Sequence, residues 1–470
     1  MLRSTRSAAI RFAHCARARH VQTGVLRTIS NEKCEAKHIS AAEAAALVKS
    51  GHWVDYGCTN SQPDAFDVAL AARKDELAGV KFRSCISMRP RAVVEADPAG
   101  DHFTWFSWHY SGYDRKAGDK GLAYHIPPHL GEIPDYYRHN LPPVDVACIK
   151  VCPKDADGFF NFGGTALWQN AVVERARTLV VEVDDKLPYA NHHGCAVHES
   201  QVDYVIDGAG HQLPELPPTV VTDVDAAVGK LVADEIEDGS CVQIGIGGMP
   251  NAVCAALLDS SVRDLGFQTE MLTDSMVDLV RSGRVTGANK ALDPGKHVYT
   301  FALGSQKLYD AIDGDDQWLC RPVEDTNMPH RIMQNSKVVS INNTTQIDLF
   351  GQAASESDGM RHISGTGGQL QFVRGAYASP GGKSFICLSS TFTKGDVTKS
   401  RIVLNLTHGN TVTTPRSDIM YVVTEFGCVN LKGQSLPDRA RLLISIAHPD
   451  YREALEREAR NNGLIPKGYW

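Results

Sequence analysis

The chain has 470 residues, of which 43% are hydrophobic, 7% aromatic and 22% charged, and its formal net charge is −7. This composition is that of a folded globular protein long enough for two or three domains, which excludes fibrous, disordered and very small disulfide-stabilised proteins. No apolar stretch approaches the ~18–20 uncharged residues that cross a bilayer, so the sequence predicts no membrane insertion.

Residues 1–30 have the composition of a mitochondrial transit peptide. Six arginines and no acidic residue precede Glu32, namely Arg3, Arg6, Arg11, Arg17, Arg19 and Arg27. Arg-rich segments without acids are typical of mitochondrial import, whereas a secretory signal needs an uninterrupted apolar block. We therefore expect the mitochondrial matrix; a basic tail that binds an anionic partner is the alternative. Without this segment the net charge is about −13, which argues against nucleic-acid binding.

The first half of the chain, residues 31–220, alternates between predicted helices and strands. Ser40 is suited to cap a helix and Gly51 to end it. The expected helices cover residues 41–50, 63–78 and 166–177, and the expected strands cover 53–56, 81–87, 144–151 and 178–183. This alternation predicts a parallel sheet covered by helices.

A proline-dense stretch at residues 213–218 predicts a linker, after which the alternation restarts. The expected helices cover residues 222–237, 250–259, 436–447 and 450–461, and the expected strands cover 241–246, 267–272, 298–303, 338–342, 347–350, 384–388, 402–406 and 419–424. The sequence therefore predicts two α/β domains, residues 31–220 and 221–470.

Two glycine-rich turns lie in the second half, at residues 245–248 (GIGG) and 365–368 (GTGG). Glycine lets backbone N–H groups approach a ligand, and a helix N-terminus favours anionic oxygen. We expect the turns to form two walls of one site, with a purely steric use of glycine as the alternative. The first turn lacks the Gly-Lys-Ser/Thr of a P-loop and the third glycine of a dinucleotide fingerprint. A nicotinamide-dependent enzyme is therefore only a second interpretation. It rests on Glu270, which follows the turn at roughly the sequence distance of a ribose-binding acid.

Two acids, Glu270 and Glu425, stand at the ends of predicted strands. The carboxyl ends of parallel strands form the ligand crevice, so both are candidates for chemistry; capping a helix or pairing with an arginine is the alternative. A G-x-S-x-G nucleophile elbow is absent from the sequence.

The 12 cysteines are dispersed along the sequence. Cys148 and Cys152 have three residues between them, where zinc ribbons and redox motifs have two. His192, His193 and His198 lack the spacing of a helical metal pair. The sequence therefore predicts neither a disulfide framework nor a metal site.

Five motifs follow one another in the second half, at residues 243–253 (QIGIGGMPNAV), 269–278 (TEMLTDSMVD), 340–352 (SINNTTQIDLFGQ), 363–374 (ISGTGGQLQFVR) and 421–427 (YVVTEFG). Together they resemble the acetyl-CoA hydrolase/transferase family, and within it the 4-hydroxybutyrate, butyrate and acetate:succinate CoA-transferases. The resemblance covers nearly the whole chain after residue 35.

The resemblance implies two tandem open α/β domains of the class I CoA-transferase type, with the active site between them, and a homodimer. The family's nucleophile falls on Glu270, which leaves Glu425 a structural role. The positions implied to contact CoA are Gln243, Ile244, Gly245, Ile246, Gly247, Thr345, Gly368 and Lys394. Lys399 flanks the same loop as Lys394. CoA is implied as a substrate and as a covalent glutamyl-CoA intermediate, with no permanently bound cofactor.

A glutamate with an ordinary pKa near ~4.3 is an anion at neutral pH, so Glu270 is expected to attack a thioester without a general base. The expected reaction moves CoA from acetyl-CoA to succinate in a ping-pong sequence. An acetyl-CoA hydrolase is the alternative, and a non-catalytic module that binds acyl-CoA or a nucleotide is a third interpretation.

Overall fold

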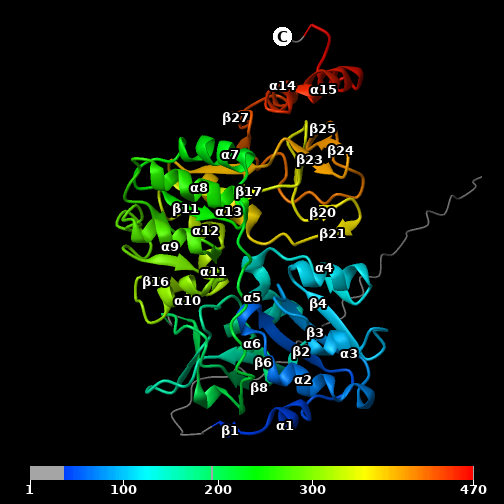
Figure 1. Cartoon of the computed structure of the whole chain (residues 1–470), viewed down its shortest axis with the longest axis vertical. Coiled ribbons are helices and arrows are strands. Elements are labelled where there is room, and N and C mark those ends of the chain that lie inside the picture. Colours follow the sequence, from blue (N-terminus) through cyan, green and yellow to red (C-terminus); the bar gives the residue numbers. More distant parts are fainter. Residues whose placement is uncertain (1–35, 192–193, 469–470) are drawn as a thin grey trace, which may run out of the picture.

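The computed structural model describes residues 36–191 and 194–468. The expected transit peptide lies outside the described residues, and so do His192 and His193. Figure 1 shows two lobes stacked along the long axis: the blue-to-teal first lobe below, and above it a second lobe coloured from green to red.

The first lobe is built on an eight-stranded parallel sheet in the order β1-β10-β8-β6-β2-β3-β4-β5. Its strands are β1 Lys37–His38, β2 Trp53–Cys58, β3 Val80–Cys85, β4 Phe103–Ser107, β5 Ala123–His125, β6 Val144–Val151, β8 Ala176–Val183 and β10 Tyr204–Asp207. The prediction of a parallel sheet is confirmed, and β6 has the predicted bounds.

The helices of the first lobe are shorter than the sequence predicts. They are α1 Ala41–Ala45, α2 Ala65–Ala71, α3 Ala92–Ala96, α4 Gly112–Asp119, α5 Ile133–Asp135 and α6 Gln169–Arg175. Ser40 caps α1 as predicted, since its side chain accepts from the backbone N–H of Glu43. The prediction that α1 reaches residue 50 is wrong, because the Arg73 guanidinium donates to the carbonyls of Ala45 and Val48 and ends the helix there. A small antiparallel pair, β7 Phe159–Asn161 and β9 Ala196–His198, completes the lobe.

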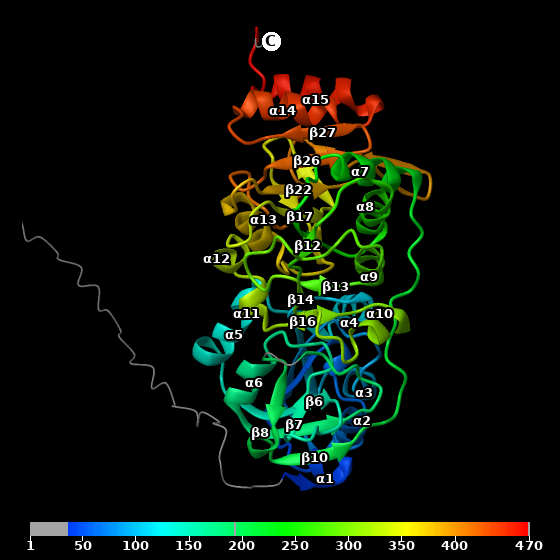
Figure 2. The ribbon, with the colours of Figure 1, turned by 90° about the vertical axis from the view of Figure 1, so that its left-hand side faces the viewer.

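The second lobe is built on a six-stranded sheet in the order β12-β11-β17-β22-β26-β27, parallel except for β27. Its strands are β11 Cys241–Ile244, β12 Gly266–Phe267, β17 Val338–Asn343, β22 Lys383–Cys387, β26 Tyr421–Thr424 and β27 Gly427–Asn430. The longer helices around it are α7 Asp223–Ala233, α8 Gly248–Asp259, α13 Gln369–Ala378, α14 Leu436–Ser445 and α15 Pro449–Asn461. In Figure 2, α13 and α8 lie on opposite sides of β17, and α14 and α15 lie at the far end of the molecule from the first lobe.

Further short elements connect the sheets. The helices among them are α9 Asp274–Arg281, α10 Gln306–Ile312, α11 Val323–Thr326 and α12 Pro329–Ile332. The strands are β13 Met271–Leu272, β14 His297–Tyr299, β15 Phe301–Ala302, β16 Trp318–Cys320, β18 Gln346–Asp348, β19 Ala353–Ala354, β20 Ser357–Asp358, β21 Arg361–His362, β23 Thr391–Lys394, β24 Val397–Ser400 and β25 Ile402–Val403.

The predicted strands at 267–272 and 298–303 are each broken in two, so the prediction of continuous strands is wrong. β12 belongs to the six-stranded sheet, whereas β13 pairs with β15. The break is stabilised by backbone hydrogen bonds, because the N–H groups of Thr300 and Phe301 both donate to the Glu270 carbonyl. Glu270 therefore lies in a kink between two sheets and not at the end of one strand.

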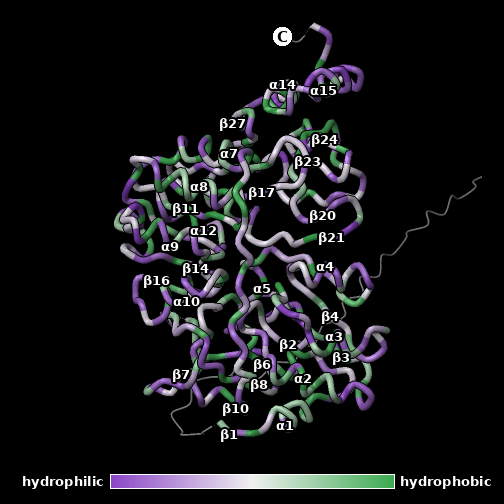
Figure 3. The backbone as a smooth tube through the Cα atoms, in the orientation of Figure 1, coloured by the Kyte–Doolittle hydropathy of each residue, from purple (hydrophilic) through white to green (hydrophobic). Residues whose placement is uncertain are grey.

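One apolar cluster extends across both lobes. It includes Trp108, Leu167 and Trp168 of the first lobe and Phe301 and Val323 of the second. In Figure 3 the outer helix α15 is mainly hydrophilic, and only Leu455 and Ala459 of that helix are buried. Among the described helices none combines the length and the apolar character needed to cross a membrane.

Candidate active site

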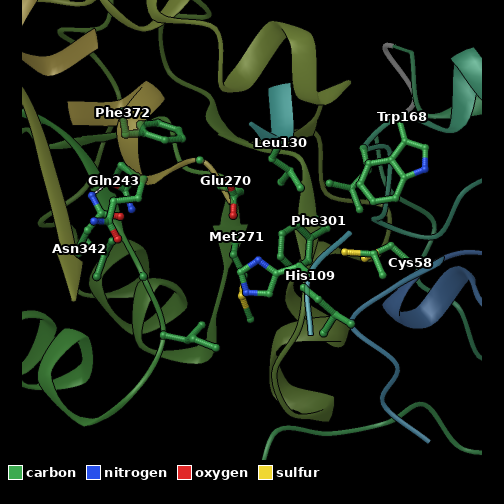
Figure 4. Close-up of a pocket in the computed structure, with 18 residues that line it drawn as sticks. Cys58, His109, Leu130, Trp168, Gln243, Glu270, Met271, Phe301, Asn342 and Phe372 are labelled. Atoms are coloured by element: carbon green, nitrogen blue, oxygen red, sulfur yellow. Dashed lines mark hydrogen bonds between the residues drawn. The ribbon is translucent and has the colours of Figure 1, made fainter. Parts of the chain in front are cut away.

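A cavity of about 160 Å³ lies between the lobes. The first lobe contributes Cys58, Cys85, Ile86, His109, Leu130, Leu167 and Trp168 to its lining. The second lobe contributes Gln243, Ile244, Gly245, Ile246, Glu270, Met271, Phe301, Asn342, Gly368, Gln369 and Phe372. Figure 4 shows Glu270 near the centre, with Gln243, Asn342 and Phe372 on one side and Leu130, Trp168 and Cys58 on the other.

The topology of the two sheets explains this position. In the second sheet the strand order reverses between β11 and β17, and Ile244 and Asn342 lie at the carboxyl ends of these strands. In the first sheet Cys58 and Cys85 end β2 and β3. Ligands of open α/β sheets bind at such ends, so the carboxyl ends of both sheets face one cavity.

Glu270 is held by donors from two other segments. Asn327 Nδ2 donates to Glu270 Oε2 at 2.6 Å, and the backbone N–H of Gly368 also donates to this carboxylate. Burial raises the pKa of Glu270 to about 7, while the bonds from Asn327 and Gly368 lower it. The expectation of an ordinary glutamate pKa is therefore wrong, because the enclosed cavity disfavours the charged form.

Gly368 can only be glycine if this contact is to form. A Cβ atom there would lie 2.2 Å from Glu270 Oε2 and 2.4 Å from Asn327 Nδ2. The neighbouring Gly367 has a φ of 56°, in the left-handed region of backbone conformation that favours glycine. The second glycine turn thus brings backbone N–H groups next to the carboxylate.

The first glycine turn reaches the same cavity. Gly245 and Ile246 line it, and Ile246 is 47% exposed at its edge. Gly247, with a φ of 116°, caps α8 next to the lining and is not part of it. Gln243 Oε1 accepts from Ser340 Oγ and Asn342 Nδ2 at 2.9 and 3.2 Å. The prediction that two glycine turns wall a single site agrees with this placement.

Four other candidate residues do not line the cavity. Thr345 donates from Oγ1 to the Ala354 carbonyl at 2.7 Å. Lys394 is exposed at the tip of the β23–β24 hairpin, and Lys399 lies in its second strand. Glu425 accepts from the backbone N–H and the hydroxyl of Ser390 at 2.9 and 2.5 Å. Glu425 therefore has a structural contact.

No sequence pattern predicts Asn327 or His109 as site residues. Asn327 follows α11, 57 residues after Glu270, and belongs to none of the motifs. His109 follows β4, which was not predicted, and burial lowers its pKa to about 4. Both reach the site only through packing between distant segments.

One group of described side chains has metal-binding chemistry, namely His125, Glu356 and His362. The two imidazoles stack with their centroids 3.8 Å apart and their planes 19° apart. The lone pair of a ring nitrogen lies in the plane of its ring. In two stacked, nearly parallel rings these lone pairs lie in separate parallel planes and do not converge on one ion. This arrangement is not organised for a metal.

Comparison with known proteins identifies relatives along both halves. The model of the acetyl-CoA hydrolase/transferase N-terminal domain matches residues 24–214, and that of the C-terminal domain matches residues 304–459.

The chain is 44% identical to the butyryl-CoA:acetate CoA-transferase of Anaerostipes caccae, over 91% of this chain and 97% of that protein. It is 42% identical to the succinyl-CoA:cyclohexane-1-carboxylate CoA transferase of Geobacter metallireducens, over 91% and 96%. The crystal structure of RipA from Yersinia pestis matches with a TM-score of 0.83 and 34% identity, over 91% and 98%. An acetyl-CoA hydrolase of Kluyveromyces lactis, 31% identical, matches only 46% of this chain and 39% of its own.

Proposed function

The chain belongs to the acetyl-CoA hydrolase/transferase family, and from this premise we propose that it is a CoA-transferase in which Glu270 carries the acyl group and CoA in turn. The proposed reaction moves CoA from acetyl-CoA to succinate. The role of Glu270 rests on one observation: its carboxylate is enclosed between the lobes and accepts hydrogen bonds from Asn327 and Gly368.

The first step is attack of the Glu270 carboxylate on the acyl-CoA carbonyl, which gives a mixed anhydride and CoA thiolate. The thiolate then attacks the glutamyl carbonyl, releases the first carboxylic acid and leaves a glutamyl-CoA thioester. A second carboxylate reverses these steps and departs as the new acyl-CoA. The carboxylate is the attacking form, so no general base is required.

The donors on Glu270 are suited to the glutamyl steps. When thiolate or carboxylate attacks the glutamyl carbonyl, the carbonyl carbon becomes tetrahedral and one oxygen of Glu270 becomes an oxyanion. Asn327 Nδ2 and the Gly368 N–H already point at an oxygen of this side chain. Donors held in place before the reaction are worth about 3–4 kcal/mol each in other enzymes.

The cavity also limits hydrolysis of the anhydride. Its walls near Glu270 are largely apolar, with Leu130, Leu167, Trp168, Phe301 and Phe372 among the lining residues. A large CoA moiety supplies binding energy that can close such a site against water. Lys394, exposed on the β23–β24 hairpin, is our candidate for a contact with a CoA phosphate, and Thr345 for a contact with the CoA chain.

Succinate is supported as one partner acid by a relative named for succinyl-CoA, and a short acyl group by a relative named for butyryl-CoA and acetate. The hydrolase alternative differs in a single respect, because water then replaces the acceptor acid.

The test measures free CoA and acyl-CoA products from acetyl-CoA, with and without succinate. Succinyl-CoA formation that requires succinate, with little CoA release in its absence, is the expected result. Rapid release of CoA without any acceptor would identify a hydrolase.

We also propose import into the mitochondrial matrix, on the basis of the arginines before Glu32, and a homodimer. Fusion of residues 1–35 to a fluorescent protein tests the first: mitochondrial fluorescence is expected, and diffuse fluorescence contradicts it. Light scattering of the purified protein tests the second.

A further inference from the structure

Two cysteines lie side by side in the wall of the cavity that contains Glu270. Cys58 and Cys85 both line it, and each is 1% exposed. The transfer steps proposed above use neither thiol.

A β-bulge brings the two residues opposite each other. Asp55 pairs with Arg83, but Cys58 pairs with Cys85, so β2 contains one more residue than β3 between these pairs. The extra residue is accommodated where Gly57 adopts a φ of 66°. Without it Cys58 would face Ile86, and its side chain would point to the other face of the sheet.

The thiols are in direct contact. Burial and a hydrogen bond with Cys58 raise the pKa of the Cys85 thiol well above its usual range. Neighbouring strands lie about 4.8 Å apart, and a disulfide spans Cα separations of about 4.4–6.8 Å. Register partners on one sheet face therefore have the spacing that a disulfide needs.

We propose that Cys58 and Cys85 are a redox-active pair in the active-site cavity. A small-molecule disulfide, such as CoA disulfide, converts this pair to an intramolecular disulfide that stops acyl transfer. The entry of CoA disulfide rests on the proposed function, since it uses the path of the CoA thiol to Glu270.

The chemistry is thiol–disulfide exchange. One cysteine loses its proton and attacks a sulfur of the small disulfide, which forms a mixed disulfide and releases one small thiol. The second cysteine loses its proton, attacks the mixed disulfide and releases the other small thiol. The protein loses two electrons and two protons, and the small disulfide gains both.

Bridging pulls the two sulfur atoms from contact to about 2.05 Å. The ends of β2 and β3 must then shift in the wall of a cavity of about 160 Å³ that also holds Glu270. A displacement of about 1 Å near reacting groups can cost about a hundredfold in rate.

A second buried pair provides a matched control. Cys195 and Cys320 are also in hydrogen-bonding contact and are both fully buried. They do not line the cavity. The proposal therefore requires that a small disulfide oxidises the first pair and leaves the second reduced.

The experiment treats the full-length protein with CoA disulfide, maps cysteine peptides by mass spectrometry and measures transfer before and after dithiothreitol. The expected result is a Cys58–Cys85 cross-link, reduced Cys195 and Cys320, and an activity loss of about tenfold to a hundredfold that dithiothreitol reverses. Cys58→Ser and Cys85→Ser should resist this loss relative to their own untreated rates, whereas Cys195→Ser should respond as the wild type does.

Absence of the cross-link in the wild-type protein, or equal oxidation of both pairs, would overturn the proposal, as would a cross-linked protein with unchanged activity. Peptide mapping does not depend on transfer, so the two proposals fail separately. A cross-link in a protein that only hydrolyses acetyl-CoA would remove the proposed function and keep the dithiol.

Discussion

Asn327 Nδ2 donates a 2.6 Å hydrogen bond to Oε2 of Glu270, from a position 57 residues further along the chain. This contact joins the kink between β12 and β13 to the end of α11, and it fixes the carboxylate at the junction of the two lobes.

Replacing Asn327 by Ala should lower kcat by about a hundredfold, because one donor to the developing oxyanion is lost. It should also move the pH–rate profile to higher pH, since this hydrogen bond lowers the pKa of Glu270. Steady-state kinetics between pH 5.5 and 9 checks both effects. A lower kcat with an unshifted profile would assign Asn327 a purely structural role.

The wild-type rate should rise as pH increases through about 7, because burial raises the pKa of Glu270 to that value and the carboxylate is the attacking form. A profile that is flat from pH 5.5 to 8 would mean that Glu270 keeps an ordinary pKa.

Glu270→Gln should stabilise the protein at high pH. The folded state holds the Glu270 proton more tightly than the unfolded chain, because burial raises the pKa from the ordinary value of 4.5 to about 7. Between these two pH values the folded state binds more protons, so wild-type stability falls as pH rises. Above pH 7 the free energy of unfolding, measured with urea, should be about 1–3 kcal/mol higher in the variant than in the wild type. This difference should vanish below about pH 4.5. Destabilisation at pH 8 would contradict this explanation.

Gly368→Ala should abolish most activity and leave the fold intact. The φ of Gly368 is −96°, which any residue tolerates, but the new Cβ would lie 2.2 Å from Glu270 Oε2. We expect a loss of about a hundredfold in kcat with an unchanged unfolding midpoint. Gly112→Ala is the matched control, because the nearest atom to its Cβ is 3.7 Å away. Full activity of Gly368→Ala would exclude this contact from the mechanism.

The stack of His125 on His362 should make the protein sensitive to acid. Burial, and then the charge of His362, lowers the pKa of His125 to about 3. The folded state therefore holds His125 neutral, and its contribution to stability is complete above about pH 6.5 and is lost as pH falls towards 3. We expect the free energy of unfolding, measured with urea between pH 4.5 and 7, to rise with pH in both proteins. The rise should be smaller by about 1 kcal/mol per pH unit in His125→Gln than in the wild type. His408→Gln, which replaces an exposed histidine by the same residue, is the matched control.

The sequence predicts the elements whose signal is local. The apolar run at Val144–Val151 makes β6 a strand with the predicted bounds, and Ser40 caps α1 through a contact three residues away. Glu270 is found as a candidate acid for the same reason, since its motif is contiguous.

The remaining features depend on contacts between distant segments. The kink at Glu270 is set by Thr300 and Phe301, and the donor Asn327 comes from outside every motif. The pairing of Cys58 with Cys85 requires the bulge at Gly57, because a shift of one residue would reverse the face of each side chain. The pKa of Glu270 follows from the enclosure by two lobes, which no local pattern describes.

Whether Glu270 carries CoA covalently is tested by incubating the protein with acetyl-CoA alone, treating it with borohydride and analysing the Glu270 peptide by mass spectrometry. A glutamyl-CoA thioester predicts reduction of the Glu270 side chain to an alcohol with loss of activity, and it predicts no such change in the Glu270→Gln variant. An unmodified Glu270 peptide from a protein that still transfers CoA to succinate would exclude the glutamyl-CoA intermediate.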